Sequence, residues 1–339
     1  TIGSIQQRDV FINTLPKIMN KLIRDEPFKD KPFLQKWLKT IIYNNVDGKK
    51  IRGLTTVCAF ESFENAENIN EQSLELACVA GWCVEMMQGY LVITDDIVDN
   101  SSVRRGSPCW YRRPDVGLRA VIDALLIKGS YCHLLKIYFQ DKPYYTQLLE
   151  IFNDAFLYTS IGQHLDCTST ALNKDYSRFT TEHYNEIVKY KTSHYTFNLP
   201  VSIAFVMTNN TNANALKLIE ELSCDIGHLF QVQNDYSDLY GDPKGDKEGN
   251  DIQEGKCTWL AVTALEKCSP RQRIVFKACY GSQQTAHYER IHQLYKDLKL
   301  PELYDNYKQE QYKKIGEKIN KLPPYMNQDL FMRILKSLY

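Results

Sequence analysis

Apolar residues recur at helical spacing along almost all of this 339-residue chain. Strand-like alternation is scarce, and the breaks between the periodic segments are short and polar. No long linker, internal repeat or low-complexity tract divides the sequence. We therefore expect an all-α helical bundle with a central cavity, forming a single domain over residues 1–339. The pattern predicts helices near residues 9–23, 32–44, 72–99, 117–139, 144–166, 178–208, 213–241 and 258–267, with others nearer the C-terminus.

Charge and cysteine usage limit the classes of partner and compartment. Lys plus Arg and Asp plus Glu both number 41, so the formal net charge is zero. That balance argues against a nucleic-acid partner. The longest uncharged run, Thr192 to Leu216, is interrupted by Pro200, so we expect no membrane span. The ten cysteines are scattered without a CxxC pair, which favours reduced thiols and a cytoplasmic location, although a removed targeting segment would leave no trace.

The first of two acidic clusters contains Asp95, Asp96 and Asp99. Asp95 and Asp99 are four residues apart, so a helix places both on one face. The preceding segment is largely apolar, and carboxylates buried there need a cationic partner. Mg²⁺ suits this role because it takes oxygen ligands and commonly bridges a carboxylate to a substrate phosphate. The alternative is a solvated helix end without a ligand.

The second cluster begins with Asn234 and continues with Asp235 and Asp238. Asn234, Asp238 and Asp242 share one helix face if the helix extends that far. Two acidic clusters on separate helices favour a divalent-metal site that binds a diphosphate. The glycine-rich and charged loop 241–250 follows directly, and it is either a lid or an ordinary solvated connection.

Several short motifs lie around these clusters in a fixed order. They resemble the trans-isoprenyl diphosphate synthase superfamily, and in particular its insect-type animal farnesyl diphosphate synthases, over essentially the whole chain. The motifs are Gly48-Lys49-Lys50-Ile51-Arg52-Gly53, Gln88, Asp95-Asp96-Ile97-Val98-Asp99, Arg104-Arg105-Gly106, Gly162-Gln163-His164-Leu165-Asp166, Tyr190-Lys191-Thr192, Phe230-Gln231 and Gly249-Asn250-Asp251 leading to Lys256.

The resemblance implies an isoprenoid (terpenoid) synthase helical bundle, a homodimer, an allylic prenyl diphosphate substrate and three Mg²⁺ ions, with Mn²⁺ as an alternative. It implies catalytic roles for Asp95, Asp96, Asp99, Arg104, Lys191 and Lys256. The implied metal ligands are Asp95, Asp99, Asn234, Asp235 and Asp238. The implied substrate-binding residues are Lys49, Arg52, Gln88, Arg104, Arg105, Lys191, Thr192, Gln231 and Lys256, with Tyr90, Leu91, Tyr195 and Phe230 around the hydrocarbon.

Four positions depart from the synthase pattern. Asn234 replaces an Asp, and Leu91 replaces an aromatic residue at the floor of the pocket. Asp47 replaces a Gly, where we expect its carboxylate to neutralise Lys49 and Arg52 and to repel a phosphate. The chain ends in 336–339 with one cation, where the synthases carry a basic cluster that closes on isopentenyl diphosphate.

Three of these departures concern isopentenyl diphosphate rather than the allylic substrate. They favour a Mg²⁺-dependent class I terpene synthase, a carbon–oxygen lyase that ionises farnesyl or geranyl diphosphate and releases diphosphate. The first alternative is a prenyltransferase, a farnesyl or geranyl diphosphate synthase, for which the retained Lys49, Arg52 and Arg105 argue. The second alternative is a non-catalytic regulatory subunit, against which the retained aspartates argue.

Overall fold

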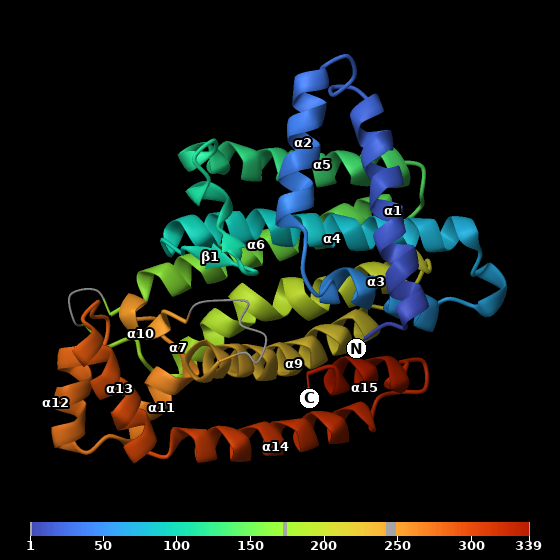
Figure 1. The fold of residues 1–339 in the computed structure, drawn as a ribbon. Coiled ribbons are helices and arrows are strands. Elements are labelled where there is room, and N and C mark those ends of the chain that lie inside the picture. The colour runs from blue at the N-terminus through green and yellow to red at the C-terminus, as the bar shows by residue number, and fades with distance from the viewer. Residues whose placement is uncertain (1, 172–174, 242–248, 339) are drawn as a thin grey trace.

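The computed structural model describes residues 2–171, 175–241 and 249–338, and it is almost entirely helical (Figure 1). The all-α prediction is therefore confirmed. The α-helices are α1 (Ile5–Arg24), α2 (Pro32–Asn45), α3 (Ile51–Phe63), α4 (Glu71–Val98), α5 (Ala120–Phe139), α6 (Tyr145–Thr168), α7 (Thr181–Val188), α8 (Leu199–Met207), α9 (Ala213–Tyr240), α10 (Asp251–Glu254), α11 (Trp259–Lys267), α12 (Pro270–Cys279), α13 (Thr285–Asp297), α14 (Leu300–Ile319) and α15 (Gln328–Lys336). The short elements are the 3₁₀ turns η1 (Ala66–Asn68), η2 (Trp110–Arg112) and η3 (Gly117–Arg119), the π-helix η5 (Lys189–Asn198) and the antiparallel strands β1 (Val103–Arg104) and β2 (Ser107–Pro108).

Helix α4 runs through the middle of the bundle and carries the first acidic cluster at its C-terminal end. Its N-terminus is capped by Asn70, whose side chain accepts the backbone N–H of Ser73. The helix is apolar and long enough to cross a membrane, but 78% of its most apolar 18-residue window is buried inside the bundle. It packs against α3 and α5. Its apolar character therefore reflects a core position.

Both acidic clusters lie at the C-terminal ends of long helices. Asp95 and Asp99 end α4, and Asp235 and Asp238 lie in the last two turns of α9. The helix dipole places partial negative charge at this end, so carboxylates there are electrostatically unfavourable without cations. The fold thus brings together two sites that each require positive charge.

Two glycines allow the π-helix η5 to lie unusually close to its neighbours. A Cβ atom on Gly162 of α6 would lie 2.0 Å from the backbone nitrogen of Lys191. A Cβ atom on Gly227 of α9 would lie 2.3 Å from Ser193 Oγ. Side chains larger than hydrogen are excluded at both contacts. The two glycines therefore fix the position of the segment that carries Lys191 and Thr192.

Buried apolar side chains form two clusters. The first joins α1–α6, η5, α8, part of α9 and α15, and the second joins α7, the end of α9 and α10–α14. The acidic end of α4 belongs to the first group, whereas Lys256 precedes α11 in the second. Residues that meet in the site therefore come from both clusters. The single-domain prediction stays a prediction.

His194 is a buried imidazole in the π-helix, and it predicts a pH dependence of stability. It is 2% exposed, and neither ring nitrogen has a hydrogen-bond partner. Its ring centroid lies 4.6 Å from that of Tyr158 and 5.8 Å from that of Tyr190. Burial, together with the nearby charge of Lys189, lowers the pKa of His194 to about 4. The folded protein therefore disfavours the imidazolium.

Because the pKa of His194 is lower in the folded state, stability contributed by the neutral ring is full above pH 6.5 and is lost as pH falls towards 4. We expect this residue to reduce the free energy of unfolding by about 1–2 kcal/mol between pH 7.5 and pH 5. Urea unfolding of the wild type and of His194→Phe at both pH values measures the difference. An equal loss of stability in the two proteins would contradict this assignment.

Candidate active site

A cavity of about 270 Å³ lies between the two acidic helix ends. Its wall is formed by the C-terminal half of α4, by α6, α7, η5 and α9, and by the segment around Lys256. Most of the site residues expected from the sequence line it. These are Arg52, Gln88, Leu91, Asp95, Asp99, Arg104, Lys191, Thr192, Tyr195, Phe230, Gln231, Asn234, Asp235 and Lys256.

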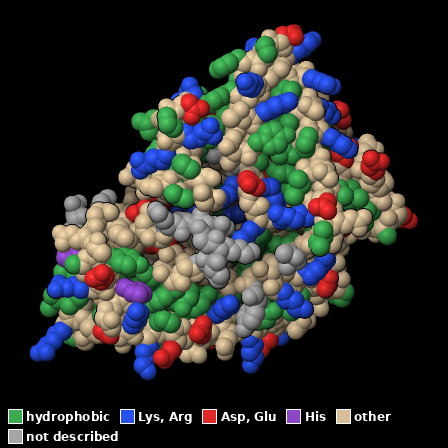
Figure 2. All heavy atoms as spheres, viewed as in Figure 1, with side chains coloured by type: hydrophobic (Ala, Val, Ile, Leu, Met, Phe, Trp, Pro, Cys, Tyr) green, Lys and Arg blue, Asp and Glu red, His purple; other side chains and the backbone are tan. Residues whose placement is uncertain are grey.

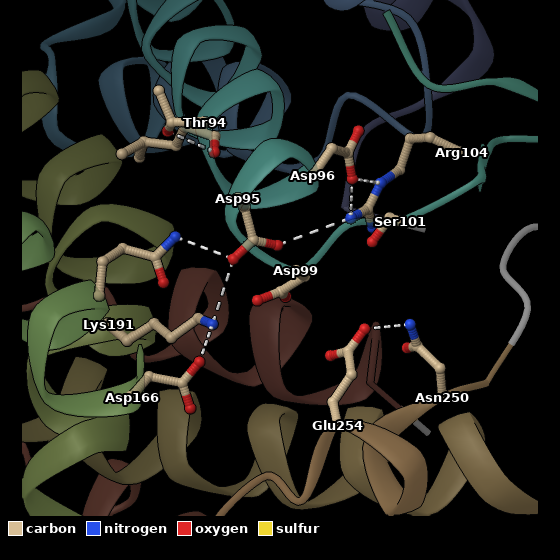
Figure 3. Close-up of polar contacts among 12 residues, drawn as sticks. Thr94, Asp95, Asp96, Asp99, Ser101, Arg104, Asp166, Lys191, Asn250 and Glu254 are labelled. Atoms are coloured by element: carbon tan, nitrogen blue, oxygen red, sulfur yellow. Dashed lines mark hydrogen bonds and ion pairs between the residues drawn. The ribbon is translucent and has the colours of Figure 1, made fainter. Parts of the chain in front are cut away.

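Two lysines, partly buried Lys191 and buried Lys256, bridge three carboxylates at the wall of this cavity, and Figure 3 shows the contacts of Lys191. Lys191 Nζ lies 3.3 Å from Asp95 Oδ1 and 2.6 Å from Asp166 Oδ2. Lys256 Nζ lies 2.7 Å from Asp99 Oδ1 and 3.1 Å from Asp166 Oδ2. The two ammonium groups and three carboxylates form one charge network, which is the arrangement that buried charges need.

The network shifts the titration of its members in opposite directions. Burial by itself would raise the pKa of Asp95, but Lys191, Lys256 and Arg104 hold it below its usual range. Burial and the charge of Asp95 raise the pKa of Asp99, which Lys256 only partly offsets. Asp95 therefore stays ionised as an oxygen ligand at neutral pH.

Arg104 joins this network from the hairpin of β1 and β2. Its Nε donates to Asp96 Oδ1 at 2.9 Å, and its Nη2 lies 3.6 Å from Asp95 Oδ2 (Figure 3). Asp96 is 2% exposed and is not part of the cavity wall. One turn of helix cannot point adjacent residues to the same side, so Asp96 holds Arg104 while Asp95 faces the cavity. The catalytic role expected for Asp96 is therefore an indirect one in this geometry.

The second acidic cluster combines an exposed side chain with a buried one, and both line the cavity. Asn234 is exposed at the cavity, whereas Asp235 is 5% exposed. Asp235 accepts hydrogen bonds from Tyr184 Oη at 2.7 Å, the backbone nitrogen of Trp259 at 2.8 Å and Gln231 Nε2 at 2.8 Å. Burial raises the pKa of Asp235 to about 6. The Asp235 carboxylate thus connects α7, α9 and α11 through these three hydrogen bonds.

Asp238 lies beyond the wall of the cavity. Its Oδ2 accepts the backbone N–H of Asp251 at 3.0 Å, which connects the end of α9 to α10. Asp242 and most of the glycine-rich loop 241–250 expected as a lid lie outside the described residues. Of the expected metal ligands, Asp95, Asp99, Asn234 and Asp235 therefore share the cavity wall, and Asp238 borders it.

The donor set fits a magnesium ion. Asp95, Asp99 and Asn234 offer carboxylate and amide oxygens to one cavity, and such oxygens are the ligands of Mg²⁺. Within the described ranges, no three acidic or metal-binding side chains already converge on one point. Mg²⁺ is commonly held by one or two carboxylates together with substrate phosphates and water. The residues therefore suit a metal that is bound together with an anionic substrate.

The cavity wall also carries buried polar atoms without hydrogen-bond partners. Arg52 Nη2 donates to Tyr195 Oη at 2.8 Å and to Thr196 Oγ1 at 2.9 Å, but its buried Nε has no partner. Gln88 Oε1 and Gln163 Oε1 are also buried without a partner. Gln163 donates from its Nε2 to Asp95 Oδ1 at 2.9 Å. An unpaired buried polar group is costly, and three of them on one cavity indicate a polar ligand.

Basic residues gather at the edge of this region, and Figure 2 shows Lys and Arg side chains around the central hollow of the face that it views. Lys49 is exposed and outside the cavity wall. Arg105 lines an adjoining cavity of about 440 Å³, which shares Arg104 and Val92 with the first. The two expected diphosphate ligands therefore lie beside the main cavity rather than inside it.

Asp47 contacts two residues of the turn in which it lies. Its Oδ1 accepts the backbone N–H of Gly48 at 2.8 Å and lies 3.4 Å from Lys50 Nζ. Asp47 thus contacts Lys50, for which the sequence predicted no role, and the expected neutralisation of Lys49 and Arg52 stays a prediction. The hydrogen bond from Gly48 lowers the pKa of Asp47, and Lys50 lowers it further.

The C-terminal segment lies against the second acidic helix (Figure 1). Gln233 Nε2 donates to the backbone oxygen of Leu338 at 2.9 Å. Gln233 directly precedes Asn234, so the end of the chain is placed next to the acidic cluster of α9. Lys336, which is the one cationic residue in 336–339, is exposed.

The apolar wall includes Leu91, Val92, Tyr195 and Phe230. Tyr90, which the sequence placed beside Leu91 at the floor, lies outside this wall. Its ring packs instead against Phe156, with 5.7 Å between the centroids. Adjacent helical residues point in directions about 100° apart, which accounts for the difference.

Sequence reasoning assigned no role to three residues of the site. Asp166 joins both lysines, Gln163 binds Asp95, and Tyr184 binds Asp235. Gln163 and Asp166 are three residues apart and share one face of α6, which is a signal that the sequence contained. Tyr184 has no such signal, because its partner is 51 residues away in the chain.

Known proteins of similar sequence and structure share this arrangement of helices. The family model described as polyprenyl synthetase matches residues 35–298. The farnesyl pyrophosphate synthase of Murgantia histrionica is 40% identical over 341 aligned positions, which cover 100% of this chain and 83% of that protein. The human farnesyl pyrophosphate synthase is 36% identical and is matched over 98% of this chain and 81% of its own length. A T. brucei farnesyl diphosphate synthase complexed with risedronate superposes with a TM-score of 0.89 at 33% identity, covering 98% of this chain and 97% of that one.

These relatives correct the favoured interpretation of the sequence. The prediction of a terpene synthase, a carbon–oxygen lyase, is wrong, because the matching proteins are named as farnesyl pyrophosphate synthases, which are prenyltransferases. The physical reason is that the departures were given too much weight. Asp47 contacts Lys50, and Arg52 and Gln88 still face the cavity with unpaired polar atoms. The chain belongs to the polyprenyl synthetase family and is similar to the farnesyl pyrophosphate synthases of insects and mammals.

Proposed function

We propose that this protein is a prenyltransferase that couples an allylic diphosphate to isopentenyl diphosphate. The observation that carries the proposal is the presence of two sets of polar groups on the wall of one cavity. One contains Asp95, Asp99, Lys191 and Lys256, and the other contains Arg52 with its unpaired Nε. A lyase needs to bind one diphosphate, whereas a coupling enzyme needs to bind two.

The first set suits the allylic diphosphate. Lys191, Lys256 and Arg104 are fixed by carboxylates, so their positive charges are oriented before the substrate arrives. Such fixed charges stabilise the negative charge that develops on a leaving diphosphate. Bound Mg²⁺ would neutralise part of the same charge, and Asp95, Asp99 and Asn234 are the residues that would hold it. We propose that three Mg²⁺ ions bind here, as the family resemblance implies.

The second set suits isopentenyl diphosphate. Arg52 and Gln88 face the cavity, and Arg105 and Lys49 lie at its edge. On the same cavity, Leu91, Tyr195 and Phe230 provide an apolar surface that would exclude water from an allylic cation. The alkene of isopentenyl diphosphate attacks C1 as the C1–oxygen bond breaks, and loss of a proton completes the new chain.

A direct assay tests this proposal. Geranyl diphosphate and isopentenyl diphosphate are supplied together with Mg²⁺, and the products are identified by mass spectrometry. We expect farnesyl diphosphate and inorganic diphosphate in equal amounts. Geranyl diphosphate alone and farnesyl diphosphate alone serve as controls. Release of a hydrocarbon or an alcohol from either control, without elongation in the mixture, would refute the proposal.

We infer that the protein forms a homodimer through α5 and α6. Four apolar residues at helical spacing, Leu118, Val121, Ile122 and Leu125, are 73%, 42%, 62% and 51% exposed. Leu157 and Ile161 of α6 are 55% and 40% exposed, and α6 contacts α5 through Phe156, whose ring lies 3.4 Å from Lys128 Nζ. An exposed apolar stripe of this kind is typical of a subunit interface.

The dimer predicts the effect of a charge on this stripe. We expect the wild type to have twice the 39.4 kDa mass of one chain, and Ile122→Asp to shift the mass to that of one chain. Light scattering after size-exclusion chromatography measures both. Ile274→Asp on α12 is the matched control, because Ile274 is 70% exposed but lies outside the stripe. A wild type with the mass of one chain would refute the inference.

A further inference from the structure

The turn before α3 adopts an unusual backbone conformation. Gly48 has φ of 124°, and Lys50, which precedes the first residue of α3, has φ of 57°. Lys50 makes no side-chain cap of the helix. A left-handed conformation is unfavourable for a residue with a side chain, so it persists only where its surroundings hold it. The contacts that hold this turn therefore decide where Lys49 and Arg52 lie.

Lys50 is a buried cation within this turn. It is 7% exposed, and its Nζ donates to the backbone oxygen of Val46 at 2.6 Å. Burial lowers the pKa of Lys50, while Glu85 and Asp47 raise it. Glu85 already accepts the backbone N–H of Gly53 at 2.8 Å through its Oε1. Asp47 is the carboxylate that lies within ion-pair distance of Lys50, at 3.4 Å.

Asp47 also fixes the backbone of the turn. It accepts the N–H of Gly48 at 2.8 Å, and its side chain is 81% exposed. One oxygen of a largely solvated carboxylate therefore serves both the backbone and the buried ammonium group. The backbone contact orients Gly48, and the charge contact holds Lys50.

The 47–50 turn also contacts the side chain of Arg105. A Cβ atom on Gly48 would lie 3.1 Å from Arg105 Nε and 3.2 Å from its Cζ, so the guanidinium packs directly on the glycine. The backbone oxygen of Lys49 accepts a hydrogen bond from Arg8 Nη1 at 2.9 Å. Arg52 follows two residues after Lys50, in the first turn of α3. Movement of the turn would therefore displace Lys49, Arg52 and Arg105 together.

We propose that Asp47 is a positioning residue for the second diphosphate site. It holds the 47–50 turn so that the three cations Lys49, Arg52 and Arg105 meet one diphosphate. The proposal rests on the proposed function, because it concerns the isopentenyl diphosphate of the coupling reaction. It also reverses the sign that the sequence suggested, in which the negative charge of Asp47 repels that ligand.

Two variants separate positioning from repulsion. Asp47→Ala removes both contacts, and Asp47→Asn keeps an oxygen for Gly48 N–H but removes the charge that faces Lys50. We expect KM for isopentenyl diphosphate to rise about tenfold in Asp47→Ala and about threefold in Asp47→Asn. We expect kcat and KM for geranyl diphosphate to stay within about twofold of the wild type. Asp154→Asn, an exposed charge change on α6, is the matched control.

Calorimetric titration with isopentenyl diphosphate provides a readout that does not require coupling. Weaker binding in Asp47→Ala, with Asp47→Asn between it and the wild type, supports the proposal. Equal or tighter binding in both variants overturns it. If the three proteins show this order of affinity for isopentenyl diphosphate while the wild type forms no farnesyl diphosphate, the proposed function fails and the role of Asp47 stands. Hydrogen exchange of the peptide that contains residues 44–53 reports the turn itself, and we expect faster exchange in Asp47→Ala.

Discussion

Replacement of Asp95 by Asn should reduce kcat for coupling by about 10³-fold. Asp95 is the carboxylate on which Gln163, Lys191 and Arg104 converge, and it lines the cavity at the expected metal position. The amide has nearly the same shape, so the change removes charge and basicity without opening a cavity. Steady-state rates with geranyl and isopentenyl diphosphates at saturating Mg²⁺ measure the effect.

The neighbouring positions supply the controls for Asp95→Asn. Asp154→Asn removes an exposed carboxylate from α6 and should leave kcat within about twofold of the wild type. Asp96→Asn should act through Arg104 and give a smaller loss than Asp95→Asn, because Asp96 does not line the cavity. A rate for Asp95→Asn within tenfold of the wild type would place the metal and the diphosphate elsewhere.

Replacement of Lys256 by Met should lower both stability and activity. Lys256 is 6% exposed and neutralises Asp99 and Asp166. Burial by itself would lower the pKa of Lys256, but the three surrounding aspartates raise it, so the group is charged when folded. Loss of the lysine leaves Asp99 without its ion pair and Asp166 with Lys191 alone, which should cost about 3 kcal/mol of unfolding free energy. Urea denaturation measures this cost, and kcat should fall at least about 10²-fold.

A second substitution shows whether the unpaired charge is the cause. Adding Asp99→Asn to Lys256→Met removes the carboxylate that has lost its ion pair and should recover part of the lost stability. Lys313→Met, at an exposed position on α14, should change the unfolding free energy by less than about 0.5 kcal/mol. If Lys256→Met costs no more than this control, the lysine is solvated and the network does not have the structure described.

The fold was predictable because periodicity is a local property of the sequence. The eight predicted segments correspond to helices or, for 178–208, to the run α7, η5 and α8. Helix α3 was not among them, although its motif was recognised. The π-helical form of η5 could not be read from the sequence, since it depends on close contacts with Gly162 and Gly227. Local patterns thus predicted where the helices lie, and tertiary packing determines whether a segment is α-helical or π-helical.

The site was predictable where a side chain acts alone and less so where it acts through a partner. The spacing of Asp95 and Asp99 placed both on one face, and the structure agrees. The sequence could not show that Asp95 and Leu91 line the cavity whereas Asp96 and Tyr90 do not. Neighbouring residues differ only in the direction in which the helix points their side chains. Asp47 shows the same limit, since its contact with buried Lys50 depends on the turn.

The π-helix η5 constrains how this chain can change during evolution. Its ten residues, Lys189–Asn198, carry Lys191 to the acidic network and Tyr195 and Thr196 to Arg52. Deleting one residue here would return the segment towards ordinary α-helical winding and rotate everything that follows by about 100°. Lys191 and Tyr195 would then no longer line one cavity together. We therefore expect a one-residue deletion in this segment to harm the site more than most single substitutions within it.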